Sequence, residues 1–237
     1  MALTAQGSAE PVPGDPVIPD EPDLREPLFF ASHANVHGSG RIGRSAQPDR
    51  AFLEFFTDLS VNMSHLHFRR SGADPGFMDL TMRSGRDWER EILRAVGSCQ
   101  VFVALLSNPY SNSPWCGREW HAFTRRRCWS RATRERTETN ECVIPVIWAA
   151  PLRESAIPAT VNAVERFIPA PLSDPTTAAL YQERGLFGLR STSHDAYTAA
   201  VWWLAREVED KLQEYWVEPE IPASHHVLTD LFSAGAA

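Results

Sequence analysis

The chain has 237 residues, of which 43% are hydrophobic and 22% charged, so it is long and apolar enough to bury one sizeable core. Its formal net charge of -7 and its lack of a long Lys/Arg run argue against nucleic acid as a partner. No stretch approaches the roughly 20 apolar residues that span a bilayer, which predicts a soluble, cytoplasmic protein without membrane contact.

The composition changes at both ends of the chain. Residues 1–26 combine frequent proline with acidic charge and few large apolar groups, which predicts a disordered acidic tail. Residues 216–237 have a similar composition and are interpreted as a C-terminal tail, in which Val227-Leu228 and Leu231-Phe232 could dock as a short anchor. The segment between them, residues 27–215, is predicted to form one domain.

Within residues 27–215, apolar runs alternate with amphipathic stretches. The expected elements, in chain order, are a strand at 27–32, a helix at 48–63, a short strand at 76–79, a helix at 87–97, a strand at 99–107, a helix opening at 113, a strand at 142–149, a last short strand at 166–168 and a helix at 196–215. Residues 99–107 form a continuous apolar run, as is typical of a parallel strand that is covered on both faces. The alternation predicts an α/β fold, with a parallel sheet and helices on both sides.

Neither the cysteines nor the histidines form a metal-binding pattern. The four cysteines, at 99, 116, 128 and 142, show no CxxC pair. Cys99 and Cys142 each begin an apolar run and are interpreted as buried small apolar residues of a reducing cytosol, and Cys116 is interpreted as a packing residue. The histidine pairs lack carboxylate or cysteine partners at zinc-ligand spacing, so no metal is expected. Residues 38–43 are rich in glycine but lack the spacing of a phosphate-binding loop, and a flexible loop is expected there.

Residues 107–119 attract attention because a polar turn leads directly into a tryptophan and a carboxylate. Ser113-Pro114 is a helix-start signal, so Trp115 and Glu119 lie four residues apart on one helix face. In open α/β sheets, ligands bind at the carboxyl ends of the strands, where this helix begins. A carboxylate there could bind sugar hydroxyls or stabilise an oxocarbenium cation, with the indole as a stacking wall. On spacing alone, the simpler interpretation is a core tryptophan beside a solvated glutamate.

A longer series of motifs resembles the Toll/interleukin-1 receptor (TIR) domain. The matching segments are Phe30-Ala31-Ser32-His33, Phe77-Met78-Asp79, Gly85-Arg86-Asp87-Trp88, Val103-Ala104-Leu105-Leu106-Ser107 and Tyr110 to Glu119. The most specific element is S-x-x-Y-x-x-S-x-W-C-x-x-E, matched at Ser107, Tyr110, Ser113, Trp115, Cys116 and Glu119. More narrowly, the insertion after the first strand, the GFMD segment and residues 181–189 look like bacterial TIR-like proteins found beside FxSxx-type peptide clusters.

The resemblance implies a flavodoxin-like three-layer sandwich with a five-stranded parallel sheet. It also implies an NAD+ glycohydrolase that releases nicotinamide and ADP-ribose or a cyclic form, in signalling or defence, with NAD+ as substrate and no separate cofactor. By the family's pattern, Glu119 is the catalytic carboxylate. The residues implied to bind NAD+ are Phe30, Ser32, His33, Phe77, Asp79 and Trp115.

The family also supplies the alternative. TIR domains self-associate, through a loop that here begins at Asp79, so a homo-oligomer and further protein partners are expected. A non-catalytic interaction module would use the same fold to recruit partners through the loop at 79–86 and the helix that follows. An enzyme requires an open pocket around Glu119, whereas a scaffold tolerates a closed one. The insertion at 33–47 could cover that pocket.

Overall fold

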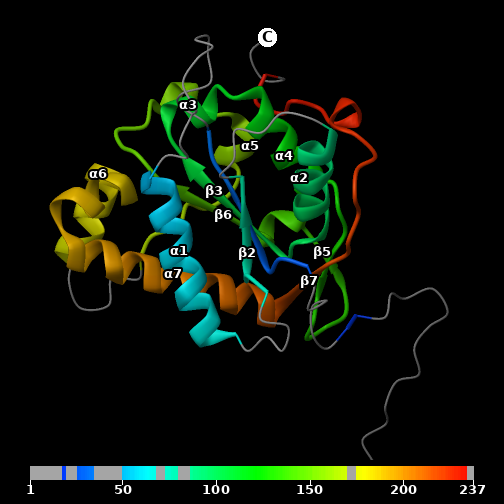
Figure 1. Cartoon of the computed structure of the whole chain (residues 1–237), viewed down its shortest axis with the longest axis horizontal. Helices are drawn as coiled ribbons and strands as arrows, with labels where there is room; N and C mark the ends of the chain where they lie inside the picture. Colours follow the sequence, from blue (N-terminus) through cyan, green and yellow to red (C-terminus); the bar gives the residue numbers. More distant parts are fainter. Residues whose placement is uncertain are drawn as a thin grey trace, which may run out of the picture.

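A computed structural model describes residues 18–19, 26–34, 50–67, 73–79, 86–169 and 175–233 (Figure 1). Its main sheet has four parallel strands in the order β2-β1-β3-β6. These strands are β1 (Phe29–Ser32), β2 (Gly76–Met78), β3 (Val101–Leu106) and β6 (Val143–Ile147). The predicted strands at 27–32, 76–79, 99–107 and 142–149 are thus confirmed, with ends that shift by one or two residues.

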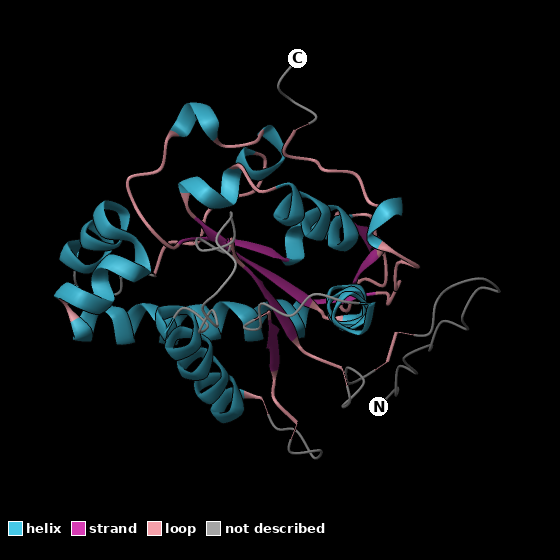
Figure 2. Cartoon of the chain, turned by 45° about the horizontal axis from the view of Figure 1, so that its top comes forward, coloured by secondary structure: helices cyan, strands magenta, loops and turns pink. Residues whose placement is uncertain are grey.

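Helices cover both faces of this sheet, as Figure 2 shows. The longer helices are α1 (Arg50–Leu66), α2 (Arg86–Ser98), α4 (Pro114–Thr124), α6 (Pro175–Thr192) and α7 (His194–Glu214). Short turns of helix are α3 (Asn108–Ser111), α5 (Ala159–Asn162), η1 (Thr139–Cys142), η2 (Glu154–Ala156) and η3 (His225–Val227). In the described part of the chain, no helix has the length and apolarity that crossing a membrane requires.

The alternation of side chains along each strand creates two apolar cores. Phe29 and Val103 belong to the core beneath α1, α6 and α7, whereas Phe30 and Phe102 belong to the core beneath α2 and α4. The three-layer α/β fold predicted from the sequence is therefore present, with the strand order of a flavodoxin-like domain.

The predicted fifth strand at 166–168 is not formed among the described residues. The segment runs beside β6 and makes one ladder-like hydrogen bond, from the Phe167 N–H to the Pro145 carbonyl at 2.9 Å. Pro145 turns its carbonyl toward this edge but has no N–H to donate there, so the ladder cannot continue. The outer edge of β6 is instead completed by α6, where the Tyr181 hydroxyl accepts from the Ile147 N–H at 2.8 Å.

A second, antiparallel sheet was not foreseen from the sequence. It has the order β5-β4-β7 and consists of β4 (Cys128–Ser130), β5 (Arg136–Thr137) and β7 (Tyr215–Val217). The buried guanidinium of Arg126 ties this sheet to the main domain by donating to the carbonyls of Val96, Cys99, Val217 and Glu218 at 2.8–3.2 Å. β7 spans the expected boundary at 215/216, so the chain that follows it starts from an anchored strand.

Candidate functional site

Glu119 lies at the carboxyl edge of the sheet because of how α4 begins. The Ser113 side chain accepts a hydrogen bond from the Cys116 N–H at 3.3 Å, and Pro114 occupies the first turn, as predicted. This start directs Cys116, Glu119 and Trp120 inward, and all three are buried. The solvated glutamate of the simpler interpretation is excluded, since the residue is 5% exposed.

Ser32, the last residue of β1, holds the Glu119 carboxyl group. Its hydroxyl donates to Glu119 Oε2 at 2.5 Å, joining residues 87 positions apart in the chain. Burial raises the pKa of Glu119 to about 8, partly offset by the Ser32 hydrogen bond and by the nearby Trp115 indole N–H, while the Asp79 carboxylate raises it further. At neutral pH, Glu119 is therefore mostly protonated in this closed arrangement.

The Trp115 ring is partly buried, and one of its faces is already stacked on another indole. Trp115 stacks on Trp88 of α2 with centroids 5.2 Å apart, and the His225 ring lies 5.9 Å away. The Trp88 indole N–H donates to Asp79 Oδ1 at 3.1 Å, which connects the start of the 79–86 loop to the Glu119 site. Among the described residues, Trp115 Nε1 is buried and makes no hydrogen bond of ordinary geometry.

Tyr110 and Cys116 pack behind the carboxyl group. The Tyr110 hydroxyl is fully buried and, in the part of the chain that the structure describes, has no hydrogen-bond partner. Burial, with smaller contributions from Cys116 and Glu119, raises the pKa of Tyr110 well above its usual value. Burial likewise raises the pKa of the Cys116 thiol, which donates to the His33 carbonyl at 3.5 Å, so this thiol is not an activated nucleophile.

The other residues implied by the family pattern are more scattered. Phe30 stacks between Phe77 and Phe102, each pair with centroids 5.7 Å apart, and so belongs to a row of rings across the sheet. The His33 ring packs on Phe52 of α1 at 4.3 Å, in the direction of the opposite helix layer. The fold thus brings Ser32, Trp115 and Glu119 together, with Asp79 joined through Trp88, and it directs the His33 ring elsewhere.

Among the described residues, little space is left beside Glu119 on the side of α2 and the C-terminal segment; most of the insertion at 33–47 lies outside the described residues. A cavity of about 10 Å³ lies between α2 and α4, lined by Leu93, Trp115, Glu119, His225 and Leu228 among others. That volume suits at most a single water molecule. The sequence did not predict that His225 and Leu228 line this cavity, because both come from the segment expected to be a tail. The apolar pair Val227-Leu228 was the sign in the sequence that this part of the segment could dock on the domain.

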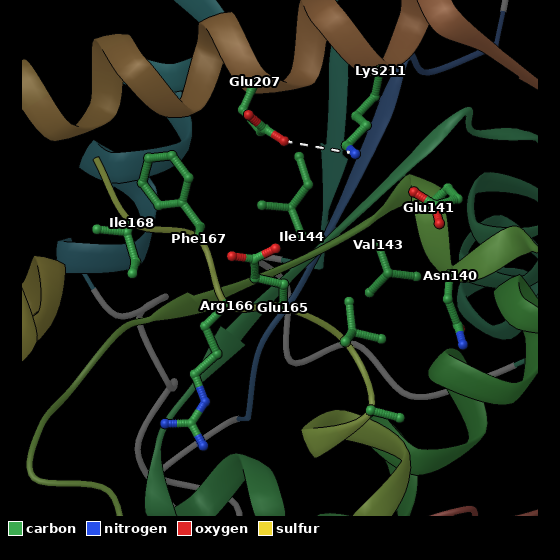
Figure 3. Close-up of a pocket in the computed structure, with 12 residues that line it drawn as sticks. Asn140, Glu141, Val143, Ile144, Glu165, Arg166, Phe167, Ile168, Glu207 and Lys211 are labelled. Carbon is green, nitrogen blue, oxygen red and sulfur yellow. Dashed lines mark ion pairs between the residues drawn. The ribbon is translucent and has the colours of Figure 1, made fainter. Parts of the chain in front are cut away.

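Two larger cavities lie away from this site. One, of about 410 Å³, lies between β6, residues 163–168 and the C-terminal half of α7 (Figure 3). Its cations are already paired, Lys211 with Glu207 at 3.8 Å and Arg166 with Glu154 at 2.7 Å. The other, of about 430 Å³, lies between α1 and the α6–α7 junction. Within the described ranges, no cluster of His, Cys, Asp or Glu side chains gathers to hold a metal ion.

A parallel sheet in this order, with a buried carboxyl group at its carboxyl edge, defines a doubly wound α/β domain with a candidate ligand site. Residues 64–180, from α1 to α6, match the family model described as TIR domain, and this range contains Trp115 and Glu119. The chain belongs to the TIR domain family, which confirms the family seen in the sequence motifs. Comparison with curated proteins and with solved structures gave no match. The narrower likeness to bacterial proteins beside FxSxx-type clusters stays a prediction.

Proposed function

We propose that this TIR domain is an NAD+ glycohydrolase, held here in a closed state, that acts in bacterial cytoplasmic signalling or defence. The observation that carries the proposal is the 2.5 Å hydrogen bond from Ser32 to Glu119, which fixes a carboxyl group at the carboxyl edge of a TIR-domain sheet. A carboxyl group that is costly to bury, yet held this closely, is the type of group found at functional sites.

In the proposed reaction, the C–N bond between ribose and nicotinamide breaks, and the electron pair leaves with nicotinamide, which becomes neutral. Glu119 accepts hydrogen bonds from the ribose hydroxyls and stabilises the developing oxocarbenium cation. Water then adds to the ribose carbon and loses a proton, giving ADP-ribose; attack by the adenine ring would give the cyclic form instead. Glu119 must be ionised for this role, which requires hydration of the site, because burial now holds its pKa near 8.

The test is nicotinamide release from NAD+ by purified protein at high concentration, with and without a crowding agent. Glu119→Gln should abolish release, since it keeps the size of the side chain and removes the charge. Glu91→Gln, an exposed glutamate on α2, is the matched control and should leave release unchanged. Equal NAD+ consumption by the wild type and Glu119→Gln would exclude Glu119 as the catalytic carboxylate.

A second function, a non-catalytic interaction module, is favoured by one observation: in the described part of the chain, the cavity that Glu119 lines between α2 and α4 has a volume of about 10 Å³, far below the roughly 300 Å³ or more of a nucleotide-sized pocket. On this alternative, the chain self-associates or recruits partners through the 79–86 loop and α2. Sedimentation analysis of variants distinguishes the interaction module from the glycohydrolase. A scaffold would lose association on charge reversal at Asp87 and Arg90, which are exposed on α2, while Glu119→Gln would have no effect on any measured property of the complex.

A further inference from the structure

The segment after β7 crosses both helices that enclose the Glu119 site. Its base is firmly held: the Glu218 N–H donates to the Arg127 carbonyl and the Glu220 N–H to the Gly97 carbonyl, each at 2.8 Å. From there residues 221–233, here called the C-terminal strap, run back along α2 and over α4. Figure 1 shows this path in red beside α2.

The strap is attached to α2 and α4 by a small set of polar contacts. The backbone N–H and the Nδ1 of His225 lie 3.0 and 2.6 Å from Glu89 Oε1, in the first turns of α2. Further along, the Thr229 N–H donates to His121 Nδ1 of α4 at 2.9 Å. Between these points the strap contains one short helical turn, His225–Val227. Val227 in this turn and Ile221 at the start of the strap are each 55% exposed. A segment with few backbone contacts to the domain opens at a lower free energy than the core does.

Two apolar side chains anchor the strap. Leu228 is 7% exposed and fills the groove between α2 and α4, where it lines the cavity together with Glu119. Phe232 packs against Tyr110 and Trp120, with ring centroids 5.6 and 6.0 Å apart. The predicted anchor is thus present, through Leu228 and Phe232.

Gly117 shows that α4 accommodates the strap. A Cβ atom at this position would lie 2.1 Å from Asp230 Oδ1 and 3.1 Å from the Phe232 backbone nitrogen. Glycine inside a helix costs about 1 kcal/mol relative to alanine, and here it allows the strap to cross directly over the helix.

We propose that residues 221–233 are an autoinhibitory strap, with Leu228 and His225 closing the Glu119 pocket, and that its release opens this pocket to a nucleotide. The nucleotide's identity as NAD+ rests on the proposed function; the closure of the pocket by the strap does not. Removing the Leu228 side chain from the groove exposes the α2–α4 side of Glu119, and the anchored base at 218–220 keeps the strap tethered.

The test uses the full chain with Leu228→Ala and Phe232→Ala combined. The matched control is Ile221→Ala with Val227→Ala, two apolar residues of the same strap that point outward. Hydrogen exchange reports strap release, and labelling of Glu119 by a water-soluble carbodiimide with glycinamide, followed by peptide mass spectrometry, reports access to the carboxyl group. Neither measurement requires turnover.

We expect the anchor variant to raise exchange in residues 221–233 and labelling of Glu119 at least tenfold, while exchange in β1, β3 and β6 is unchanged and the control resembles the wild type. Unlabelled Glu119 despite a released strap would overturn the proposal, as would an equal rise in exchange throughout the sheet. Gly117→Ala provides a second variant that removes no core contact and should change both measurements in the same direction. NAD+ consumption is scored separately: a labelled Glu119 without turnover contradicts the glycohydrolase, not the strap.

Discussion

Replacing Glu119 by Gln should stabilise the protein increasingly as the pH rises, because the substitution removes a buried ionisable group and keeps its size. The folded-state pKa is about 8 against an ordinary value of 4.5. Below pH 4.5, the carboxyl group is protonated in both states and has no linked effect on stability. Between pH 4.5 and 8, the unfolded chain loses the proton while the folded chain keeps it, so the wild type loses stability with rising pH.

The magnitude follows from the two pKa values. The linked loss amounts to roughly 2 to 3 kcal/mol between pH 5 and pH 7, and to roughly 3 to 4 kcal/mol between pH 5 and pH 8. Urea unfolding of both proteins at pH 5, 6, 7 and 8 measures it as the difference between variant and wild type, which cancels all other titrating groups. A difference that stays constant across this range would refute the reasoning, since it would mean that Glu119 titrates normally in the folded protein.

Three further substitutions, the first with a matched control, test the packing around the sheet by the free energy of unfolding. Arg126→Met should cost about 3 kcal/mol, because it leaves several buried carbonyls without a donor, whereas Arg125→Met, at an exposed ion pair, should cost less than about 1 kcal/mol. Gly185→Ala should cost about 2 kcal/mol or more, since the residue has a φ of 66° and a Cβ would lie 2.5 Å from a backbone carbonyl oxygen; an unchanged unfolding midpoint would contradict this. Tyr181→Phe should cost about 1–3 kcal/mol, because it leaves the buried Ile147 N–H of β6 unpaired; a wild-type-like unfolding midpoint would show that this hydrogen bond does not stabilise the protein.

The elements predicted best are those whose signal is local. Val101–Leu106 was identified because a continuous apolar run needs no partner to be recognised, and α4 because Ser113-Pro114 specifies its first turn. The strands of the second sheet are two or three residues long and carry polar side chains, so no periodicity develops in them. α6 was missed because Gly185 interrupts its helical geometry and weakens its pattern.

The candidate site also combines residues that could be paired from the sequence with residues that only the fold brings together. Trp115 and Glu119 could be paired from the sequence because one helical turn separates them. Ser32 was named from the family pattern, but that its hydroxyl would hold the carboxyl group required β1 and α4 to meet across 87 residues. The covering of Trp115 by Trp88 also depends on contact between two helices.

The sequence by itself determined the α/β class and the strand and helix candidates of the main sheet, because each depends on near neighbours in the chain. It also determined the TIR family, through short motifs in a fixed order, and it singled out Glu119 as the candidate carboxylate. Tertiary structure decided the environment of that carboxylate. Its burial, its raised pKa and its enclosure by Leu228 and His225 arise from segments far apart in sequence that exclude water together. Desolvation depends on everything that surrounds a group, so it can be read only from the packed molecule.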